Sequence, residues 1–300
     1  MSVSVLLAPL VAGWLSLGCT GCGVYFPGED WAGYERTALA MGKMKMERVP
    51  SGMPVSKKAL ADNFRRIAFG IEHDVLDKDD PATSEGGRLR RWQKPVRYHL
   101  TSLGLDASKH AAQVGETAAR IAEATGHDIA ETVEGGRENL TIMVLRPQDY
   151  RLAAAAVVNR PGGKWLAAQI DRFGRAGHTP CVGIFLHAVA PEAGQVDEIL
   201  YALAIIRAGL PPRLGRACIE EEMAQAMGLP NDHPRVRPSV FNDDQEFALL
   251  TGHDEALLRI LYDKRLDPGM TEGQAMALVP DIIGGMDTSR FDGRAALTRE

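Results

Sequence analysis

The spacing of apolar residues along the first half of the chain switches between a helical period and a strand period. After Ser56, apolar side chains recur every three or four positions with basic residues on the opposite face, which is typical of an amphipathic surface helix. From Pro95 onward, short strand-like runs flank an Ala-rich segment of helical period that stops at Gly126. The predicted elements are helices over 56–74 and 107–125 and strands over 96–100, 127–133 and 140–145.

The second half of the chain continues this mixture of helical and strand-like runs. Residues 149–170 have helical character, and the apolar run 182–186 predicts a strand. The run 199–206 is apolar throughout, so its pattern fits a buried strand or a helix equally well. The remaining predicted elements are a helix from Pro211 to Gly228, an amphipathic helix over 254–262 and a turn-rich tail from Asp267.

An almost unbroken apolar run lies near the N-terminus, over Val5–Leu17. Small residues and cysteines follow it, an order that is typical of a secretory signal, although no Lys or Arg precedes the run. We therefore predict a signal peptide or lipoprotein signal over 1–22, with Cys19 or Cys22 as the lipidated residue. A buried N-terminal helix is the alternative. The expected location is the periplasm or cell envelope, and residues 23–55 are expected to form a tether or a loosely docked segment.

The charge and hydropathy of the chain argue against a nucleic-acid-binding protein and against a membrane-spanning helix beyond the N-terminal run. The chain has 34 basic and 39 acidic residues and a net charge of -5, so it lacks the basic surface of a nucleic-acid-binding protein. Beyond the N-terminal run no stretch is long and apolar enough for a membrane helix, so membrane contact is expected only through the signal or a lipid.

In an exported chain, Cys181 and Cys218 predict a disulfide that contributes about 3–4 kcal/mol. Two buried free thiols are the alternative.

The helix predicted from Pro211 carries the clearest chemical pattern. Glu221 and Gln225 are four positions apart and project from one helix face, with Glu222 beside them. Gly228 can end the helix, because glycine adopts a positive φ at low cost. Asn231 follows three residues later, on a chain that has doubled back. The spacing therefore predicts three side chains that converge on one point and a carboxylate next to them.

This spacing resembles the zinc helix of the metzincin peptidases, H-E-x-x-H-x-x-G-x-x-H, with the histidines replaced. Glu221, Gln225 and Asn231 stand at the three ligand positions. Glu222 stands at the position of the general base, and Gly228 keeps the turn. The resemblance therefore implies a peptidase-like site in which the ligands have changed.

Positions outside the helix extend the resemblance over residues 94–265. Asp232 follows the third ligand position, and Phe241 falls where the Met-turn methionine is expected. The implied fold is α+β and metzincin-like, a mixed twisted sheet with a long backing helix, an active-site-type helix and a C-terminal helix. We expect this domain over 94–300, after a helix and loop over 56–93. The residues R-x-C-I-E-E and S-V-F-N-D also resemble a proteobacterial lipoprotein family with a domain of unknown function.

The substituted residues are weak ligands for zinc. Catalytic zinc sites use His, Cys or carboxylate donors, whereas Gln225 and Asn231 offer neutral amide oxygens that suit Ca²⁺ or Mg²⁺ better. Without zinc the pKa of water stays near its high bulk value, so Glu222 has no activated water to deprotonate. His233 is close enough in sequence to reach the cleft, although an exposed loop histidine is the plainer interpretation. We expect neither a metal nor a cofactor, and we expect the neighbouring Glu220 to be solvated.

Three functions are compatible with this pattern. The first is an exported, non-catalytic pseudoenzyme whose cleft binds a peptide or an envelope protein along an edge strand at 182–186. The second is a metal-dependent hydrolase with Glu221, Gln225 and Asn231 as ligands and Glu222 as the base. The third is a structural envelope protein whose cleft is filled by its own side chains. The loss of the histidines favours the pseudoenzyme.

Overall fold

The computed structural model describes residues 30–50, 52–70, 87–132, 137–160, 162–187 and 197–287. The predicted signal over 1–22, with Cys19 and Cys22, lies outside these residues. None of the helices in these ranges combines the length and apolar character needed to cross a membrane.

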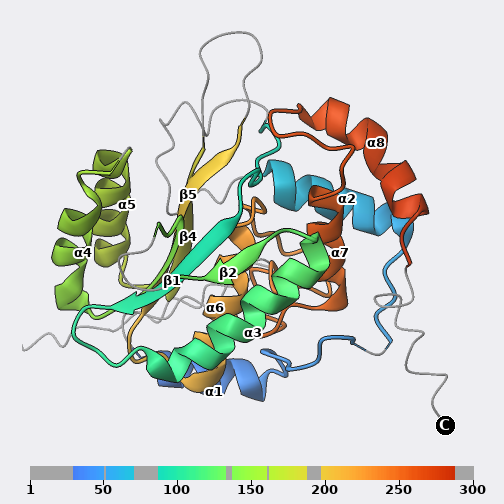
Figure 1. Ribbon diagram of the computed structural model, residues 1–300. Helices are drawn as coiled ribbons and strands as arrows, with labels where there is room; N and C mark the ends of the chain where they lie inside the picture. The colour runs from blue at the N-terminus through green and yellow to red at the C-terminus, as the bar shows by residue number, and fades with distance from the viewer. Residues whose placement is uncertain are drawn as a thin grey trace, which may run out of the picture.

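A mixed five-stranded sheet forms the centre of the protein (Figure 1). Its order is β2-β1-β3-β5-β4, and all neighbours pair in parallel except β4, which lies antiparallel to β5 at one edge. The ambiguous run at 199–206 is therefore a strand, and the strand predicted at 127–133 is shorter than expected. The strands are β1 (Val96–Ser102), β2 (Ile129–Glu131), β3 (Leu140–Leu145), β4 (Cys181–His187) and β5 (Ile199–Arg207).

The alternation of side chains along the inner strands separates two apolar cores. On β3, Leu140 and Ile142 face one core, and Met143 and Leu145 face the other. The first core is covered by α2, α3, α6, α7 and α8, and the second by α4 and α5 (Figure 1). Because both faces of β5 are covered, its residues are almost all apolar, and its period therefore could not distinguish it from a helix.

The helices begin and end largely where the sequence pattern placed them. Ser56 caps α2, since its Oγ accepts a hydrogen bond from Ala59 N at 3.1 Å. Gly126 ends α3 in the left-handed conformation, with φ of 66°. The helices are α1 (Trp31–Ala40), α2 (Lys57–Phe69), α3 (Ser108–Thr125), α4 (Tyr150–Val157), α5 (Gly163–Arg175), α6 (Pro212–Gln225), α7 (Gly252–Leu261) and α8 (Glu272–Gly284), with a 3₁₀ helix over Pro147–Asp149.

Helix α8 lies in the segment that the sequence pattern predicted to be rich in turns. Two glycines at its ends and Pro280 inside it weaken the helical signal. The helix forms because Thr271 and Gln274 make a reciprocal capping box at its start. Its buried face, which includes Val279 and Ile282, joins the core shared with α2 and α7.

The described part of residues 23–55, which were expected to form a tether or a loosely docked segment, is docked on the domain. Helix α1 packs against α6, and residues 42–50, which we call the N-terminal strap, run beside residues 245–252. Met44 N donates to Gln245 O and Ala248 N donates to Lys45 O, both at 2.9 Å. Met44 is completely buried. The strap therefore belongs to the folded unit.

Candidate functional site

Helix α6 is held at both ends by features that fix its position. At its start, Glu35 of α1 accepts hydrogen bonds from the backbone N–H groups of Arg213 and Leu214, at 2.9 and 2.8 Å. These N–H groups have no partner within the helix, and the carboxylate also interacts favourably with the helix dipole. At its end, Gly228 has φ of 110°, and a Cβ there would lie 2.1 Å from Arg90 O. Only glycine fits this turn.

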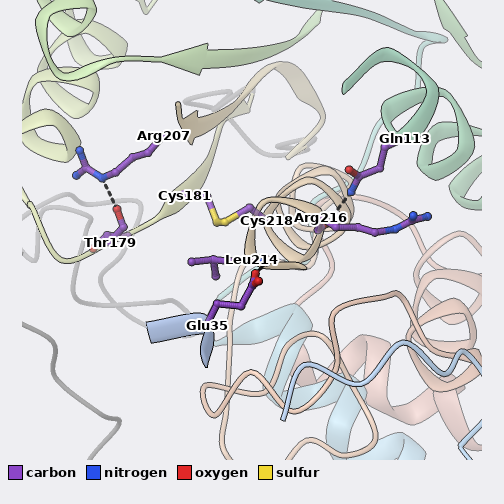
Figure 2. The surroundings of a disulfide bond; sticks show 8 residues. All are labelled: Glu35, Gln113, Thr179, Cys181, Arg207, Leu214, Arg216 and Cys218. Carbon is purple, nitrogen blue, oxygen red and sulfur yellow. Dashed lines mark hydrogen bonds between the residues drawn. A yellow bond between two sulfur atoms is a disulfide. The ribbon is translucent and has the colours of Figure 1, made fainter. Parts of the chain in front are cut away.

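A disulfide joins α6 to the edge strand. Cys218 in the middle of α6 is bonded to Cys181 at the start of β4. Figure 2 shows this bond between the helix and the strand, with Glu35 and Leu214 nearby at the start of the helix. The predicted disulfide is therefore present, and it fixes the helix face that carries the candidate site against the sheet.

Glu220 is buried, although it was expected to be solvated. Its carboxylate accepts two hydrogen bonds from Arg48 of the N-terminal strap, at 2.8 and 2.7 Å, and one from Leu250 N at 2.7 Å. Its side chain is completely inaccessible to solvent. This arrangement is structural, because it ties the strap and the segment before α7 to α6.

Four polar side chains gather where the other face of α6 meets β4. We call Glu221, Glu222, Gln225 and Asp232 the carboxylate cluster. Glu221 and Glu222 each place a carboxylate oxygen within 4.8 Å of the other and of Cys181 Sγ. Gln225 Nε2 donates to Asp232 Oδ1 at 3.0 Å, and Glu221 is hydrogen-bonded to the same carboxyl group. The three α6 members are 7% exposed or less.

Asp232, rather than Asn231, faces the residues of α6. The side chain of Asn231 points to the end of α2, where its Nδ2 donates to Arg66 O at 2.9 Å. It also lies against Gly70, where a Cβ would come within 2.2 Å of that nitrogen. Adjacent side chains on an extended chain point in opposite directions, so only one of these two neighbours can join the cluster. Asn231 therefore holds α2 and is not a third ligand.

The carboxyl group of Asp232 keeps its proton to a higher pH than an exposed aspartate does. Burial raises the pKa of Asp232 to about 6, and the charge of Asp243 adds to this, while hydrogen bonds with Glu221 and Gln225 act in the opposite direction. Two carboxyl groups can be hydrogen-bonded to each other only when one carries a proton. Burial, with the charges of Glu221 and Asp244, also raises the pKa of Tyr34 in α1 to about 12.

The edge strand lies close to the cluster at Gly183. A Cβ at this position would lie 2.8 Å from Glu222 Oε2 and 3.2 Å from Gln225 Oε1. Gly183 is partly exposed, whereas Glu222 beneath it is buried. The absence of a side chain on Gly183 therefore lets two polar groups of α6 reach the edge of the sheet.

Main-chain groups of β4 point outward at the same place. Arg207 N of β5 donates to Pro180 O at 3.0 Å, which sets the alternation of inward and outward groups along β4. Gly183 and Phe185, at odd positions, therefore direct their N–H and C=O groups away from β5. Among the described residues, no strand pairs with this outer edge.

Two other predicted site residues serve the local loop. His233 Nδ1 accepts a hydrogen bond from Arg235 N at 3.0 Å, and His233 N donates to Phe241 O. Burial and the charge of Arg66 lower the pKa of His233. Phe241, at the Met-turn position, is completely buried in the larger core. Neither residue belongs to the carboxylate cluster.

A buried network that the sequence pattern did not reveal lies behind this loop. Asp254 accepts hydrogen bonds from Ser239 Oγ, Val240 N and Thr251 N. The adjacent His253 contacts Asn63 through Nε2 at 3.1 Å. Ser, His and Asp are the residues of a hydrolase triad, but here the serine donates to the aspartate and all three side chains are buried. The network therefore caps α7 and holds α2.

Comparison with protein families places the chain in one of them. A model of the family described as Protein of unknown function (DUF2927) matches residues 57–281, which is more than half of the chain. The chain belongs to the DUF2927 family. This match confirms the prediction of a family with a domain of unknown function. No curated protein matches this DUF2927 chain.

Replacing Asp232 in this DUF2927 protein is expected to remove a pH dependence of its stability. A folded-state pKa of about 6, against an ordinary value of 3.8, means that the folded protein binds this proton more tightly than the unfolded chain does. The stabilisation is present below about pH 4 and is lost as the pH rises through about 6. Asp232→Asn carries no charge and can still accept from Gln225. It should be more stable than the natural protein by about 1–3 kcal/mol at pH 7.5, with almost no difference at pH 4.

Urea unfolding at several pH values measures this difference. Asp244→Asn is the matched control, because its carboxylate is half exposed and pairs with Lys43 at the surface. It should show no gain in stability at pH 7.5. Equal unfolding free energies for Asp232→Asn and the natural protein at pH 7.5 would contradict the expectation.

Proposed function

We propose that this DUF2927 protein is an exported, metzincin-like pseudoenzyme that binds an extended peptide segment with a basic side chain. The peptide would come from a partner in the periplasm or cell envelope. It would pair with the outer edge of β4, and its basic side chain would interact with the carboxylate cluster beside Gly183. The observation that carries this proposal is the approach of Glu222 and Gln225 to Gly183, at a point where the edge strand also offers main-chain groups.

The arrangement of the elements supports a metzincin-like architecture. The sheet has an antiparallel strand at the edge next to α6, and α6 ends in a glycine turn that brings Asp232 back to it. These are the places in which the resemblance puts the cleft edge and the active-site helix. The disulfide between β4 and α6 supports an oxidising compartment, because such bonds are rare in reducing ones.

The chemistry of the cluster supports a non-catalytic role. The zinc of the metzincin peptidases does not fit the residues present, since Asn231 is turned toward α2 and Gln225 uses its amide group to donate to Asp232. The cluster has no imidazole donor among its members. Glu222 keeps the position of a general base, but activation of a water molecule needs a Lewis acid that lowers the pKa of that water, and the residues present are poor ligands for zinc.

The edge of β4 and the cluster together favour an extended basic ligand. An extended peptide gains main-chain hydrogen bonds from an unpaired sheet edge, and the nearby side chains determine its specificity. Here the nearby groups are three carboxyl groups, of which Asp232 carries a proton below about pH 6. Above that pH the cluster is more negative, so a Lys or Arg side chain would reduce its repulsion.

Binding of synthetic heptapeptides tests this function. Peptides that differ only at a central Lys, Leu or Glu would be measured by fluorescence anisotropy at pH 7.5 and two salt concentrations. The Lys peptide should bind at least about 10-fold more tightly than the Leu peptide, and more weakly at high salt. Glu222→Gln should remove most of this preference.

Two variants at Phe185 separate main-chain pairing from side-chain contact. Phe185→Pro removes the outward N–H but leaves the ladder to β5, because the lost group does not face β5. Phe185→Ala keeps the N–H and is the matched control. The proline variant should lose binding beyond any loss in the alanine variant. If both variants and Glu222→Gln bind every peptide as the natural protein does, the edge of β4 is not the site.

A metal-dependent hydrolase is the second candidate. It is favoured by the oxygen atoms of Glu221 and Glu222, which lie within 4.8 Å of each other. Because Asn231 is turned away, the ligands would be Glu221, Gln225 and Asp232, with Glu222 as the base. Oxygen donors suit Ca²⁺, Mg²⁺ or Mn²⁺. Elemental analysis of the disulfide-bonded protein after dialysis against these ions tests this candidate, and substoichiometric metal would exclude it.

A further inference from the structure

The disulfide lies directly beside two members of the carboxylate cluster. Cys181 Sγ is within 4.8 Å of carboxylate oxygens of both Glu221 and Glu222, and all three residues are buried. Cys218 is bonded to Cys181, so a second sulfur lies at the same place. In the disulfide both sulfur atoms are neutral and poor ligands, but reduction converts them into two potential thiolates.

We propose that reduction of the Cys181–Cys218 disulfide creates a binding site for a thiophilic divalent cation such as Zn²⁺ or Cd²⁺. The donors are the two cysteine sulfurs and the carboxylates of Glu221 and Glu222. This site shares Glu221 and Glu222 with the carboxylate cluster but does not require that a peptide binds there, and its two sulfur donors are not among the ligand positions that the metzincin resemblance implies.

The helix supplies three of these four donors on one face. Cys218, Glu221 and Glu222 stand at positions i, i+3 and i+4 of α6, and residues three and four apart are neighbours on a helix surface. Cys181 faces them from β4, which pairs with β5 along its whole length. The donors therefore come from two rigid elements, as a preorganised metal site requires.

The donor atoms lie close enough together for side-chain rotations to form a tetrahedral site. A zinc–sulfur bond of about 2.3 Å and zinc–oxygen bonds of about 2.0–2.2 Å place ligand atoms about 3.5 Å apart. The observed spread of 4.8 Å can close to this value by small side-chain rotations. Two sulfur and two oxygen donors suit Zn²⁺ or Cd²⁺ better than Ca²⁺ or Mg²⁺. Gly183, which lies next to Glu222, is partly exposed, so the donors are close to the protein surface.

The chemical steps balance with a dithiol as the reductant. The dithiol passes two electrons to the Cys181–Cys218 bond, becomes a disulfide itself and leaves two cysteine thiols on the protein. Neighbouring carboxylates disfavour thiolates in the absence of metal, because like charges repel. Binding of the cation then displaces two protons from the thiols.

Cobalt spectroscopy on the full chain tests the site. The protein would be prepared without oxygen, either disulfide-bonded or reduced with a phosphine that is then removed, and titrated with Co²⁺. The reduced protein should bind one equivalent, with sulfur-to-cobalt charge-transfer absorption and tetrahedral ligand-field bands. Its affinity should exceed that of the oxidised protein by at least about 100-fold. Added Zn²⁺ should displace the cobalt.

Variants assign the donors and keep the test decisive. Reduced Cys181→Ser should lose the charge-transfer band, and Glu222→Gln should bind at least about 10-fold more weakly. Glu47→Gln, at an exposed position on the strap, should bind as the natural protein does. Equal binding by the oxidised and reduced proteins overturns the proposal and favours the oxygen-ligand hydrolase instead. Binding only by a reduced chain that has lost its near-UV circular dichroism also overturns it, because the folded site is then not the receptor.

Discussion

Glu220→Gln is expected to lower the free energy of unfolding by about 3–5 kcal/mol. The carboxylate is completely buried and accepts hydrogen bonds from Arg48 and from Leu250 N. The amide of glutamine has one acceptor oxygen in place of two and would turn N–H groups toward the guanidinium. Arg48, whose side chain is 21% exposed, would then keep a charge without its partner. Urea unfolding followed by circular dichroism measures the loss.

Two comparisons identify the Arg48–Glu220 contact as the cause. Glu116→Gln is the matched control, because that carboxylate is 61% exposed and pairs with Arg216, so its loss should cost less than about 0.5 kcal/mol. Replacing both Arg48 and Glu220 by methionine should restore much of the stability, since neither charge then remains buried. A loss below about 1 kcal/mol for Glu220→Gln would show that the strap contributes little to the fold.

Removal of the disulfide is expected to cost a similar amount. The double variant Cys181→Ala/Cys218→Ala should be less stable than the oxidised protein by about 3–4 kcal/mol, because the bond closes a loop between residues separated by 37 positions in the sequence. The bond also ties α6 to the edge strand. Unfolding under non-reducing conditions provides the measurement.

The reduced natural protein serves as the control for this double variant. The reduced natural protein keeps both cysteine side chains but lacks the cross-link. Its unfolding free energy should therefore lie close to that of the double variant when no metal is present. Agreement between the double variant and the oxidised natural protein within about 1 kcal/mol would contradict the expected role of the bond.

The sequence pattern predicted the helices and strands whose apolar residues recur with a clear period. Helix α3 and strand β3 lie where expected, and so does α6, because each has an unambiguous period or a glycine or proline at its ends. Strand β5 was ambiguous because it is buried on both faces. Helix α8 was missed because glycines and a proline hide a helix that is stabilised by its cap and by contacts with α2.

The candidate site was predicted in part, and the difference has a physical cause. Spacing along a helix fixes which side chains share a face, so Glu221 and Gln225 lie together as expected. Spacing beyond the glycine turn does not fix the direction of each side chain. Asp232 therefore joins the cluster, which was expected of Asn231, and Asn231 contacts the end of α2. Glu220 was expected to be solvated because its partner Arg48 is 172 residues away in the chain. A contact between residues so far apart in the chain leaves no recognisable pattern in the sequence around either of them.

The position of Glu35 has a practical consequence for work on this family. The region matched by the family begins at residue 57, but the carboxylate that caps α6 belongs to Glu35 in α1, which lies upstream of that region. A recombinant fragment that begins at residue 57 would leave two backbone N–H groups of α6 without their hydrogen-bond acceptor. It would also expose to solvent the apolar surface that Met44 covers. Boundaries chosen from sequence matching alone would therefore divide one cooperative unit, and expression designs for this protein should start at or before residue 30.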